Sequence, residues 1–356
     1  MAKIRIGVVG CGVIGTRHIQ AAAASPLIDL VAVADPIEER ARAKAAEFHV
    51  PGVFRQGLDL VKDPSVEAVV LAVPTGGRAA LAREAFRRGK HVLLEKPPAM
   101  NAAEIEELMR IAGDRVGACC SSRFTFLEGF RAARAEIASG RLGDLREVYV
   151  RALNGADRAP TEPPPAWRVS KAQNGGGILV NWGTYDLDYL LALTGWTLEP
   201  RAVFAQTWRV APHLQAHVAP GSDAESHYVA LVRCAGGEMI HIERAEFSTI
   251  ANEAAWQVVG TRGSLRLSMA FTGEKTLYVD ETTTEAGVAS RVLWQGTEND
   301  QDYHKGPVLD FAGAILEKRE PRTNLRRALV LQKIFDAVYE SSASGKLAVI
   351  KPPRGR

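Results

Sequence analysis

Residues 4–35 run IRIGVVGCGVIGTRHIQAAAASPLIDLVAVAD. A β-branched run, Ile4–Val9, leads into three glycines spaced G-x-G-x-x-G, and Val13–Ala24 then has the apolar periodicity of a helix. A second apolar run, Asp29–Ala34, ends at an acid, Asp35. The stretch predicts a strand, a tight turn, a helix and a second strand, which together form one unit of a parallel sheet.

The three glycines form a candidate phosphate cradle. Glycine permits a tight turn and a close approach of the backbone to a pyrophosphate, and the N-terminus of the following helix offers free N–H groups and positive potential. The spacing alone is weak evidence, but here the glycines follow a predicted strand and open a predicted helix, and the last of them precedes Asp35 by 20 residues. We expect a bound dinucleotide, contacted by Gly10, Gly12, Val13, Ile14 and Gly15.

Asp35 decides which dinucleotide is expected. A carboxylate here accepts hydrogen bonds from the adenosine ribose, and its charge would repel a 2′-phosphate, so NAD is favoured over NADP. An aspartate before Pro36 can instead simply form a turn, and that interpretation stays open. A later strand ends at Val73, Pro74 and Thr75, in the crevice where ligands of such sheets bind, so these residues are also expected to contact the cofactor.

The alternation of strands and helices continues along the first third of the chain. It predicts a doubly wound parallel sheet of the α/β class, with helices on both faces, as one dinucleotide-binding domain at residues 1–122. Its predicted strands are 4–9, 29–34, 68–73, 91–94 and 116–120, and its predicted helices are 13–24, 38–48, 78–88 and 102–112.

From residue 123 the pattern changes. Runs rich in Val, Ile, Thr and aromatic residues are separated by glycine-containing breaks, which predicts a large, open, mostly antiparallel sheet in an α+β domain at 123–356. Its predicted strands are 145–153, 202–210, 227–234, 238–247, 255–260, 264–269 and 276–280, and its predicted helices are 130–139 and 325–342.

Composition excludes several classes of partner. The 356 residues suffice for about two domains. The net charge of +3 comes from scattered charges, so neither nucleic acid nor a membrane surface is expected, and the partner is a small molecule. The densest basic stretch places Arg83, Arg87, Arg88 and Lys90 among alanines, which is typical of the solvent side of an amphipathic helix.

The four cysteines, Cys11, Cys119, Cys120 and Cys234, lack the spacing of metal ligands. They predict small buried residues in a reducing compartment, and no metal site is expected. The chain starts without an apolar leader, and no stretch reaches the roughly 20 apolar residues of a membrane helix, so a cytoplasmic location is expected.

A second motif, Glu95-Lys96-Pro97, follows the predicted strand 91–94, on the same edge of the sheet as the glycine loop. A lysine there can assist the deprotonation of a substrate hydroxyl as hydride leaves the same carbon. Its ordinary pKa of about 10.4 is too high for a base at neutral pH, so a nearby cation or desolvation would have to lower it. Taken alone, such a lysine is more often a surface residue.

Three motifs together resemble one family. They are the glycine loop at 10–15, the Glu95-Lys96-Pro97 string, and Gly175-Gly176-Gly177 followed by Gly183 and Asp188. They are similar to those of the glucose-fructose oxidoreductase, inositol dehydrogenase and rhizopine-catabolism (Gfo/Idh/MocA) family, and the likeness covers nearly the whole chain. The resemblance implies a Rossmann domain, an open sheet domain, and NAD(P)-dependent oxidation or reduction of sugars, cyclitols or related polyols. It also implies homodimers or homotetramers through the C-terminal sheet, and it adds Glu95 and Lys96 to the expected cofactor contacts.

The chain departs from the family after the triple glycine. The family usually has an Asp and a His four residues apart there, where this chain has Asn181 and Tyr185, and it keeps the later acid as Asp188. This spacing would place the three side chains on one stripe of a helix. A phenol whose pKa of about 10 is lowered by an ammonium group can exchange a proton with an alcohol. We expect Lys96, Tyr185 and Asn181 to be the catalytic group, with Asn181 orienting the substrate or Tyr185; simple packing of Tyr185 stays an open alternative.

Substrate contacts are expected from the long segment 154–174, which contains Pro160, Pro163, Pro164 and Pro165 and lacks periodicity. Trp167 and Arg168 at its far end could stack on a sugar face and bind hydroxyls, and Arg123 could join them. Ordinary packing of Trp167 is an equal alternative. Lys96, Asn181, Tyr185 and Asp188 complete the expected substrate-binding group.

The residues and the resemblance favour an NAD-dependent dehydrogenase that oxidises a secondary hydroxyl of a sugar, sugar derivative or cyclitol. A sugar–sugar oxidoreductase with a tightly bound cofactor, or an NADPH-dependent reductase of keto sugars, is the alternative within enzymes. A cofactor-binding regulatory sensor of the same fold is the alternative outside them, because fold alone does not determine function.

Overall fold

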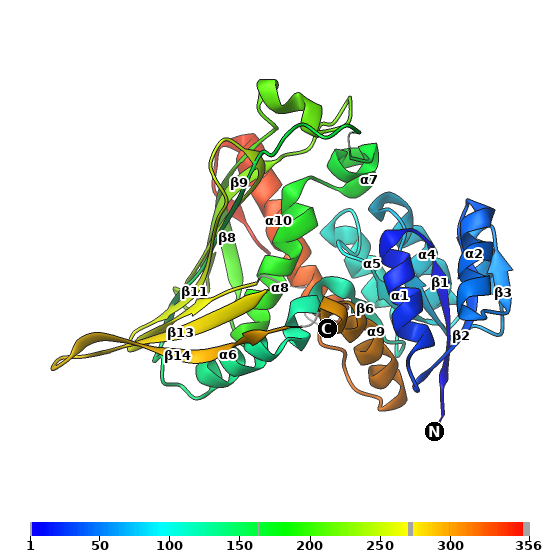
Figure 1. The fold of residues 1–356 in the computed structure, drawn as a ribbon, viewed down its shortest axis with the longest axis horizontal. Helices are drawn as coiled ribbons and strands as arrows, with labels where there is room; N and C mark the ends of the chain where they lie inside the picture. Colours follow the sequence, from blue (N-terminus) through cyan, green and yellow to red (C-terminus); the bar gives the residue numbers. More distant parts are fainter. Residues whose placement is uncertain (1, 163, 270–272, 299, 352–356) are drawn as a thin grey trace. The chain divides into compact units, whose positions relative to one another are not determined.

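The computed structural model describes residues 2–162, 164–269, 273–298 and 300–351, so Pro163 lies outside the described residues. The chain forms two compact units (Figure 1): Met1–Arg123 with Gln301–Leu329, and Phe124–Asp300 with Val330–Arg356. The first unit runs to residue 123, and residues 301–329 return to it. The expectation of one continuous second domain at 123–356 did not foresee this return.

The first unit is built on a six-stranded sheet with the order β3-β2-β1-β4-β5-β6, in which every pair is parallel. This order is that of the doubly wound fold, so the predicted fold class is confirmed. The strands are β1 (Ile4–Val9), β2 (Ile28–Ala34), β3 (Gly52–Phe54), β4 (Ala68–Leu71), β5 (His91–Leu94) and β6 (Gly117–Cys119). The helices are α1 (Val13–Ala23), α2 (Glu38–Phe48), α3 (Gly57–Lys62), α4 (Thr75–Arg87), α5 (Ala102–Ala112) and α9 (Asp300–Leu316).

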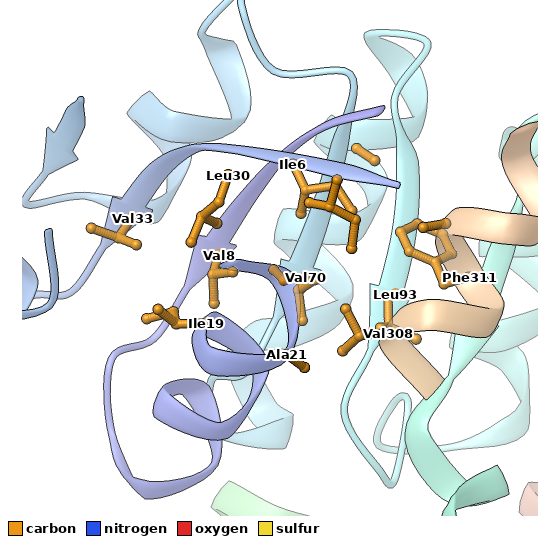
Figure 2. Packing of buried hydrophobic residues seen from close by; sticks show 14 of the residues in the cluster. Ile6, Val8, Ile19, Ala21, Leu30, Val33, Val70, Leu93, Val308 and Phe311 are labelled. Carbon is orange, nitrogen blue, oxygen red and sulfur yellow. The ribbon is translucent and has the colours of Figure 1, made fainter. Parts of the chain in front are cut away.

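Both faces of this sheet are buried, which explains why its strands read as continuous apolar runs. On one face Ile6, Val8 and Val70 pack in a cluster that also receives Val308 and Phe311 from α9 (Figure 2). On the other face a second cluster gathers around alternate strand residues, including Val69, Leu71, Val92 and Leu94. Each fully buried aliphatic side chain stabilises the fold by about 1.5–3 kcal/mol.

Lys90 corrects one prediction. Arg87 and Arg88 are exposed as expected of the solvent side of a helix, but Lys90 is buried. It follows the end of α4, and its ammonium group donates to the carbonyls of Asp63 at 2.7 Å and Val66 at 2.5 Å. Burial accordingly lowers the pKa of Lys90.

The second unit is built on a nine-stranded sheet with the order β14-β13-β12-β11-β7-β10-β9-β8-β15. Among the described strands of this sheet, only β7 and β10 pair in parallel, so the predicted mostly antiparallel sheet is confirmed. The strands are β7 (Leu145–Gly155), β8 (Pro200–Trp208), β9 (His227–Cys234), β10 (Met239–Ser248), β11 (Glu253–Gly260), β12 (Gly263–Leu267), β13 (Glu274–Thr283), β14 (Gly287–Thr297) and β15 (Ala348–Val349). The sequence did not predict β14, since none of its residues is buried and no alternation marks it.

Helices α6 (Glu128–Ala138), α8 (Thr184–Leu193) and α10 (Leu325–Ser344) lie along one face of this sheet (Figure 1). Large apolar side chains remain exposed on the strands, including the paired Phe204 and Leu231 on β8 and β9, with Phe204 53% exposed. Trp208 is also exposed, at the end of β8. Among the described residues, no helix is both long and apolar enough to span a membrane.

Candidate functional site

The glycine loop joins β1 to α1 at the C-terminal edge of the first sheet. Gly10 has φ +100°, and a Cβ there would lie 2.5 Å from the carbonyl oxygen of Ala72, while a Cβ on Gly15 would lie 1.8 Å from the carbonyl oxygen of Gly10. The close packing of the backbone therefore requires glycine at both positions, whether or not a ligand binds. Gly12 is different, because its φ is −72° and a Cβ there would meet no heavy atom of the described residues within 4 Å.

Gly12 thus borders a space that no described residue fills. The next residue, Val13, is 90% exposed at the start of α1, where backbone N–H groups point out of the helix. An open cradle at a helix N-terminus fits the pyrophosphate of a dinucleotide. The parallel pairing of Val9 with Leu71 sets this loop beside Val73, Pro74 and Thr75, as the sequence predicts.

Asp35 is buried at the end of β2. Its Oδ2 accepts a hydrogen bond from the backbone N–H of Cys11 at 2.8 Å, and its Oδ1 accepts one from Ile37 at 2.9 Å. The bond to Ile37 is the turn contact that the sequence left open, and the bond to Cys11 ties Asp35 to the glycine loop. Each carboxylate oxygen can accept a second hydrogen bond, so a ribose hydroxyl could still bind here.

A buried arginine fixes the ends of β4 and β5. Arg78, from the first turn of α4, donates through Nη2 to the carbonyl of Val73 at 2.5 Å and through Nη1 to that of Glu95 at 2.9 Å, and it also binds the carbonyl of Pro97. One guanidinium group therefore joins the predicted cofactor loop to the Glu95-Lys96-Pro97 loop. The Lys96–Pro97 peptide bond is cis. The sequence did not predict this role for Arg78, because the local pattern of residues does not distinguish a buried arginine from an exposed one.

The carboxylate of Glu95 is bound by protein groups. It accepts from His18 Nε2 of α1 at 2.7 Å and from the backbone N–H of Lys96 at 3.0 Å, and it pairs with Arg123. Burial would raise the pKa of Glu95, but Arg123 and His18 outweigh it and hold the pKa well below its ordinary value. Glu95 therefore anchors the half-buried Lys96 to α1, and its predicted contact with the cofactor stays a prediction.

His18, Glu95 and Cys120 bring three potential metal ligands within 4.8 Å of one another. The chemistry of the set argues against a cation. Arg123 binds the same Glu95 oxygen that faces His18, and burial raises the pKa of the Cys120 thiol well above its ordinary value, which keeps it neutral.

Backbone conformation and close packing account for each glycine of the triple glycine, Gly175-Gly176-Gly177, in the second unit. Gly175 has φ +82°, and a Cβ on Gly176 would lie 1.8 Å from the hydroxyl of Tyr339. A Cβ on Gly177 would lie 1.9 Å from the carbonyl oxygen of Glu225. Leu179–Gly183 then forms a π-helical turn that continues into α8.

This π-helical turn interrupts the regular α-helix that was expected to carry Asn181, Tyr185 and Asp188. Asn181 lies in the turn while Tyr185 and Asp188 lie in α8, and all of them are buried; the common stripe of the three side chains stays a prediction. Asn181 donates through Nδ2 to the carbonyl of Arg168 at 3.1 Å and accepts through Oδ1 from Asn174 at 3.2 Å. The structure therefore brings Asn181 and the end of the long segment together.

Two aromatic rings lie beside Tyr185. Its ring lies edge-on to those of Phe124 and Trp182, with centroids 5.6 and 5.7 Å away. In the long segment, Trp167 is 40% exposed, and the guanidinium of Arg168 donates to Glu246 at 2.7 Å.

A buried ion pair next to Tyr185 also escaped the sequence reading. Arg244 of β10 binds Asp186 of α8 through Nε at 2.6 Å and Nη2 at 2.8 Å, and Trp256 Nε1 donates to the same carboxylate at 3.0 Å. Trp182 stacks on Arg244, whose Cζ lies 4.8 Å from the ring centroid. The pair ties α8 to the sheet.

A glycine loop for the pyrophosphate and a fixed lysine loop, both at the C-terminal edge of a parallel sheet, are typical of a dinucleotide-dependent oxidoreductase. Residues 4–122 match the family model described as oxidoreductase family, NAD-binding Rossmann fold, and residues 130–266 match the GFO/IDH/MocA C-terminal domain. The chain belongs to the Gfo/Idh/MocA family and is an NAD(P)-dependent oxidoreductase, as predicted.

Relatives support this assignment over almost the full length. The chain is 30% identical over 355 residues to dTDP-3,4-didehydro-2,6-dideoxy-alpha-D-glucose 3-reductase of Streptomyces violaceoruber, covering 93% of this chain and 97% of the relative. It is 25% identical over 344 residues to D-xylose 1-dehydrogenase (NADP(+)) 2 of Haloferax volcanii, covering 95% and 97%. The structure of a levoglucosan dehydrogenase in complex with NADH has the same fold, with a TM-score of 0.86, 22% identity, and coverage of 99% and 100%.

Proposed function

We propose that the protein is an NAD-dependent dehydrogenase that reversibly oxidises a secondary hydroxyl group of a sugar, sugar derivative or cyclitol. The observation that carries the proposal is the cradle left open at Gly12 beside a lysine loop that Arg78 and Glu95 hold in place. Bound NAD would supply the hydride acceptor. Relatives named as dehydrogenases and reductases of sugars support the substrate class.

In this proposal Lys96 and Tyr185 handle the proton of the substrate hydroxyl, and Asn181 orients the substrate. The backbone N–H of Lys96 donates to the carboxylate of the buried Glu95, which supports a positioned lysine rather than a mobile surface lysine. The hydrogen bonds of the Asn181 side chain support an orienting role.

Trp167, Arg168 and Asp188 are proposed to complete the substrate site, and the exposure of Trp167 supports a stacking role. Arg123 is bound to Glu95, which favours a role in holding the lysine loop; its contact with substrate stays a prediction.

NAD is proposed over NADP because the Asp35 carboxylate lies against the glycine loop. Reduction of a keto sugar with NADPH is the second candidate, favoured by the relatives named as a 3-reductase and as an NADP(+) enzyme. We also propose self-association as a homodimer or homotetramer through the exposed apolar residues of the second sheet. All four cysteines are buried, and buried cysteine thiols support the proposed cytoplasmic location.

The test is NADH formation from NAD⁺ with a panel of aldoses, deoxy and anhydro sugars, uronates and inositols. Lys96→Ala is expected to lose about 10²- to 10⁴-fold in turnover on the active substrate while it still binds NADH, and Tyr185→Phe somewhat less. Lys62→Ala, an exposed lysine of α3, is the control and should retain full activity. Wild-type turnover by Lys96→Ala would refute the mechanism.

A further inference from the structure

Glu225 is a buried acid that the proposed chemistry leaves unused. It lies just before β9, and its Oε1 accepts hydrogen bonds from the backbone N–H groups of Gly177 at 2.9 Å and Leu179 at 3.0 Å. Its own carbonyl oxygen accepts from the N–H of Ile178 at 3.0 Å. One residue therefore binds the three consecutive amides that open the helix after the triple glycine.

Such amides are otherwise left without partners at a helix N-terminus, where a negative charge is also favourable. A capping side chain normally comes from the chain just before the helix. Here the capping carboxylate belongs to Glu225, which lies 48 residues after Gly177 in the sequence.

The glycines make this arrangement possible. The backbone of Gly177 approaches Glu225, and that of Gly176 approaches Tyr339, more closely than any side chain would allow. The Tyr339 hydroxyl of α10 donates to the same Oε1 at 3.1 Å, while Oε2 is buried and has no hydrogen-bond partner among the described residues. A carboxylate that leaves one oxygen unpaired in the interior is a costly way to build a cap, which suggests a function beyond stability.

The cap acts directly on the proposed catalytic group. The backbone N–H of Asn181 donates to the carbonyl of Gly177 at 3.0 Å, so a shift of Gly177 moves Asn181 within the same turn, and Tyr185 lies one turn later. The Asn181 side chain is also bound to the Arg168 carbonyl, so it cannot follow such a shift without breaking that bond.

We propose that Glu225 is the positioning residue of the helix that follows the triple glycine and continues into α8: it holds Gly177 and Leu179 from a distant part of the chain and thereby sets the orientation of Asn181 and Tyr185. This inference rests on the proposed function, in which those two residues act on the substrate. It also assigns a role to the triple glycine, which admits Glu225 and Tyr339 to the start of the helix.

The experiment compares Glu225→Ala and Glu225→Gln with the wild type, scoring kcat and KM for substrate and NAD⁺ on folded protein, together with amide hydrogen exchange at residues 176–185. Glu225→Ala is expected to lower kcat about 10- to 100-fold at unchanged KM for NAD⁺, as a misplacement near 1 Å would, and to speed exchange in that segment. Glu225→Gln keeps an acceptor oxygen and should recover most of kcat. Glu136→Ala, which removes a buried acid of α6 bound by Arg141 and Arg291, is the control and should keep kcat.

Folded Glu225→Ala with wild-type kcat, or with wild-type exchange at 176–185, overturns the proposal. If Glu225→Ala does not fold, Tyr339→Phe removes one donor to the same oxygen and is expected to lower kcat roughly 2- to 10-fold; an unchanged kcat then overturns it. If exchange is faster but the wild type oxidises no member of the panel, the proposed function has failed, and with it the catalytic part of this inference.

Discussion

Breaking the buried pair of Asp186 and Arg244 should destabilise the second unit strongly. Both side chains are buried and joined by two short hydrogen bonds, and Asp186 also accepts from Trp256. Asp186→Asn keeps the shape of the side chain and an oxygen for Trp256, but it leaves the charge of Arg244 without its carboxylate.

Removing one partner of a buried ion pair destabilises a fold by about 3–5 kcal/mol. The Trp182 ring and Glu246 remain near Arg244 and offset part of its charge, so we expect about 3 kcal/mol for Asp186→Asn. The double variant Asp186→Asn, Arg244→Met removes both charges. It should recover at least half of that loss, which gives a coupling free energy of about 1.5 kcal/mol or more.

Tryptophan fluorescence during urea unfolding is a suitable assay, because all six tryptophans lie between residues 167 and 294, within the second unit. Arg266 and Asp280 supply a matched control. Their pair is also bidentate, at 2.8 and 2.9 Å, but Arg266 is 46% exposed. Asp280→Asn should therefore change the free energy of unfolding by less than about 1 kcal/mol. If Asp186→Asn destabilises no more than Asp280→Asn, the reasoning from burial is wrong.

Three further predictions concern the two proposed sites. Gly12→Ala should weaken NADH binding at least 10-fold and change the free energy of unfolding by no more than about 1 kcal/mol. Gly15→Ala should lower the free energy of unfolding by about 1–3 kcal/mol, because its Cβ would meet the Gly10 carbonyl. Calorimetric titration measures the effect on binding, and urea unfolding measures the effect on stability. Asp35→Ser should weaken NAD binding by about 10- to 100-fold and narrow the gap to NADP, and an unchanged preference when both cofactors are titrated would remove Asp35 from that role. Burial raises the pKa of Glu225 above 4.5 despite its donors, so the folded state binds its proton more tightly than the unfolded chain. The stability from this group is fully present below pH 4.5 and is lost as the pH rises through the raised pKa. Burial raises the pKa values of Tyr228 and Tyr339, which face Glu225, so both tyrosines stay neutral in this pH range. The stability of the wild type relative to Glu225→Gln should therefore fall from pH 4.5 to 7 in urea titrations, and a constant difference would contradict the shift.

Much of the first unit could be predicted because its signals are local. A strand buried on both faces must be apolar throughout, and a pyrophosphate cradle needs glycines at set spacings followed by a helix. Accordingly, β1, α2, β5 and α5 have the predicted bounds. In the second unit, alternation predicted the strands that carry one buried face, whereas β14 escaped because it buries none of its residues.

The amino-acid sequence by itself determined the fold class, the family and the candidate cradle and lysine loop, since each depends on patterns or motifs whose own residues lie close together in the chain. Only the tertiary structure decided which charged residues are buried and what they bind. Arg78 clamps two loops, Asp186 meets Arg244 58 residues away, and Glu225 binds Tyr339 114 residues away. Local patterns report propensity and periodicity, but the partner of a buried polar group is set by how distant strands and helices pack, and that partner determines whether the group can be buried at all.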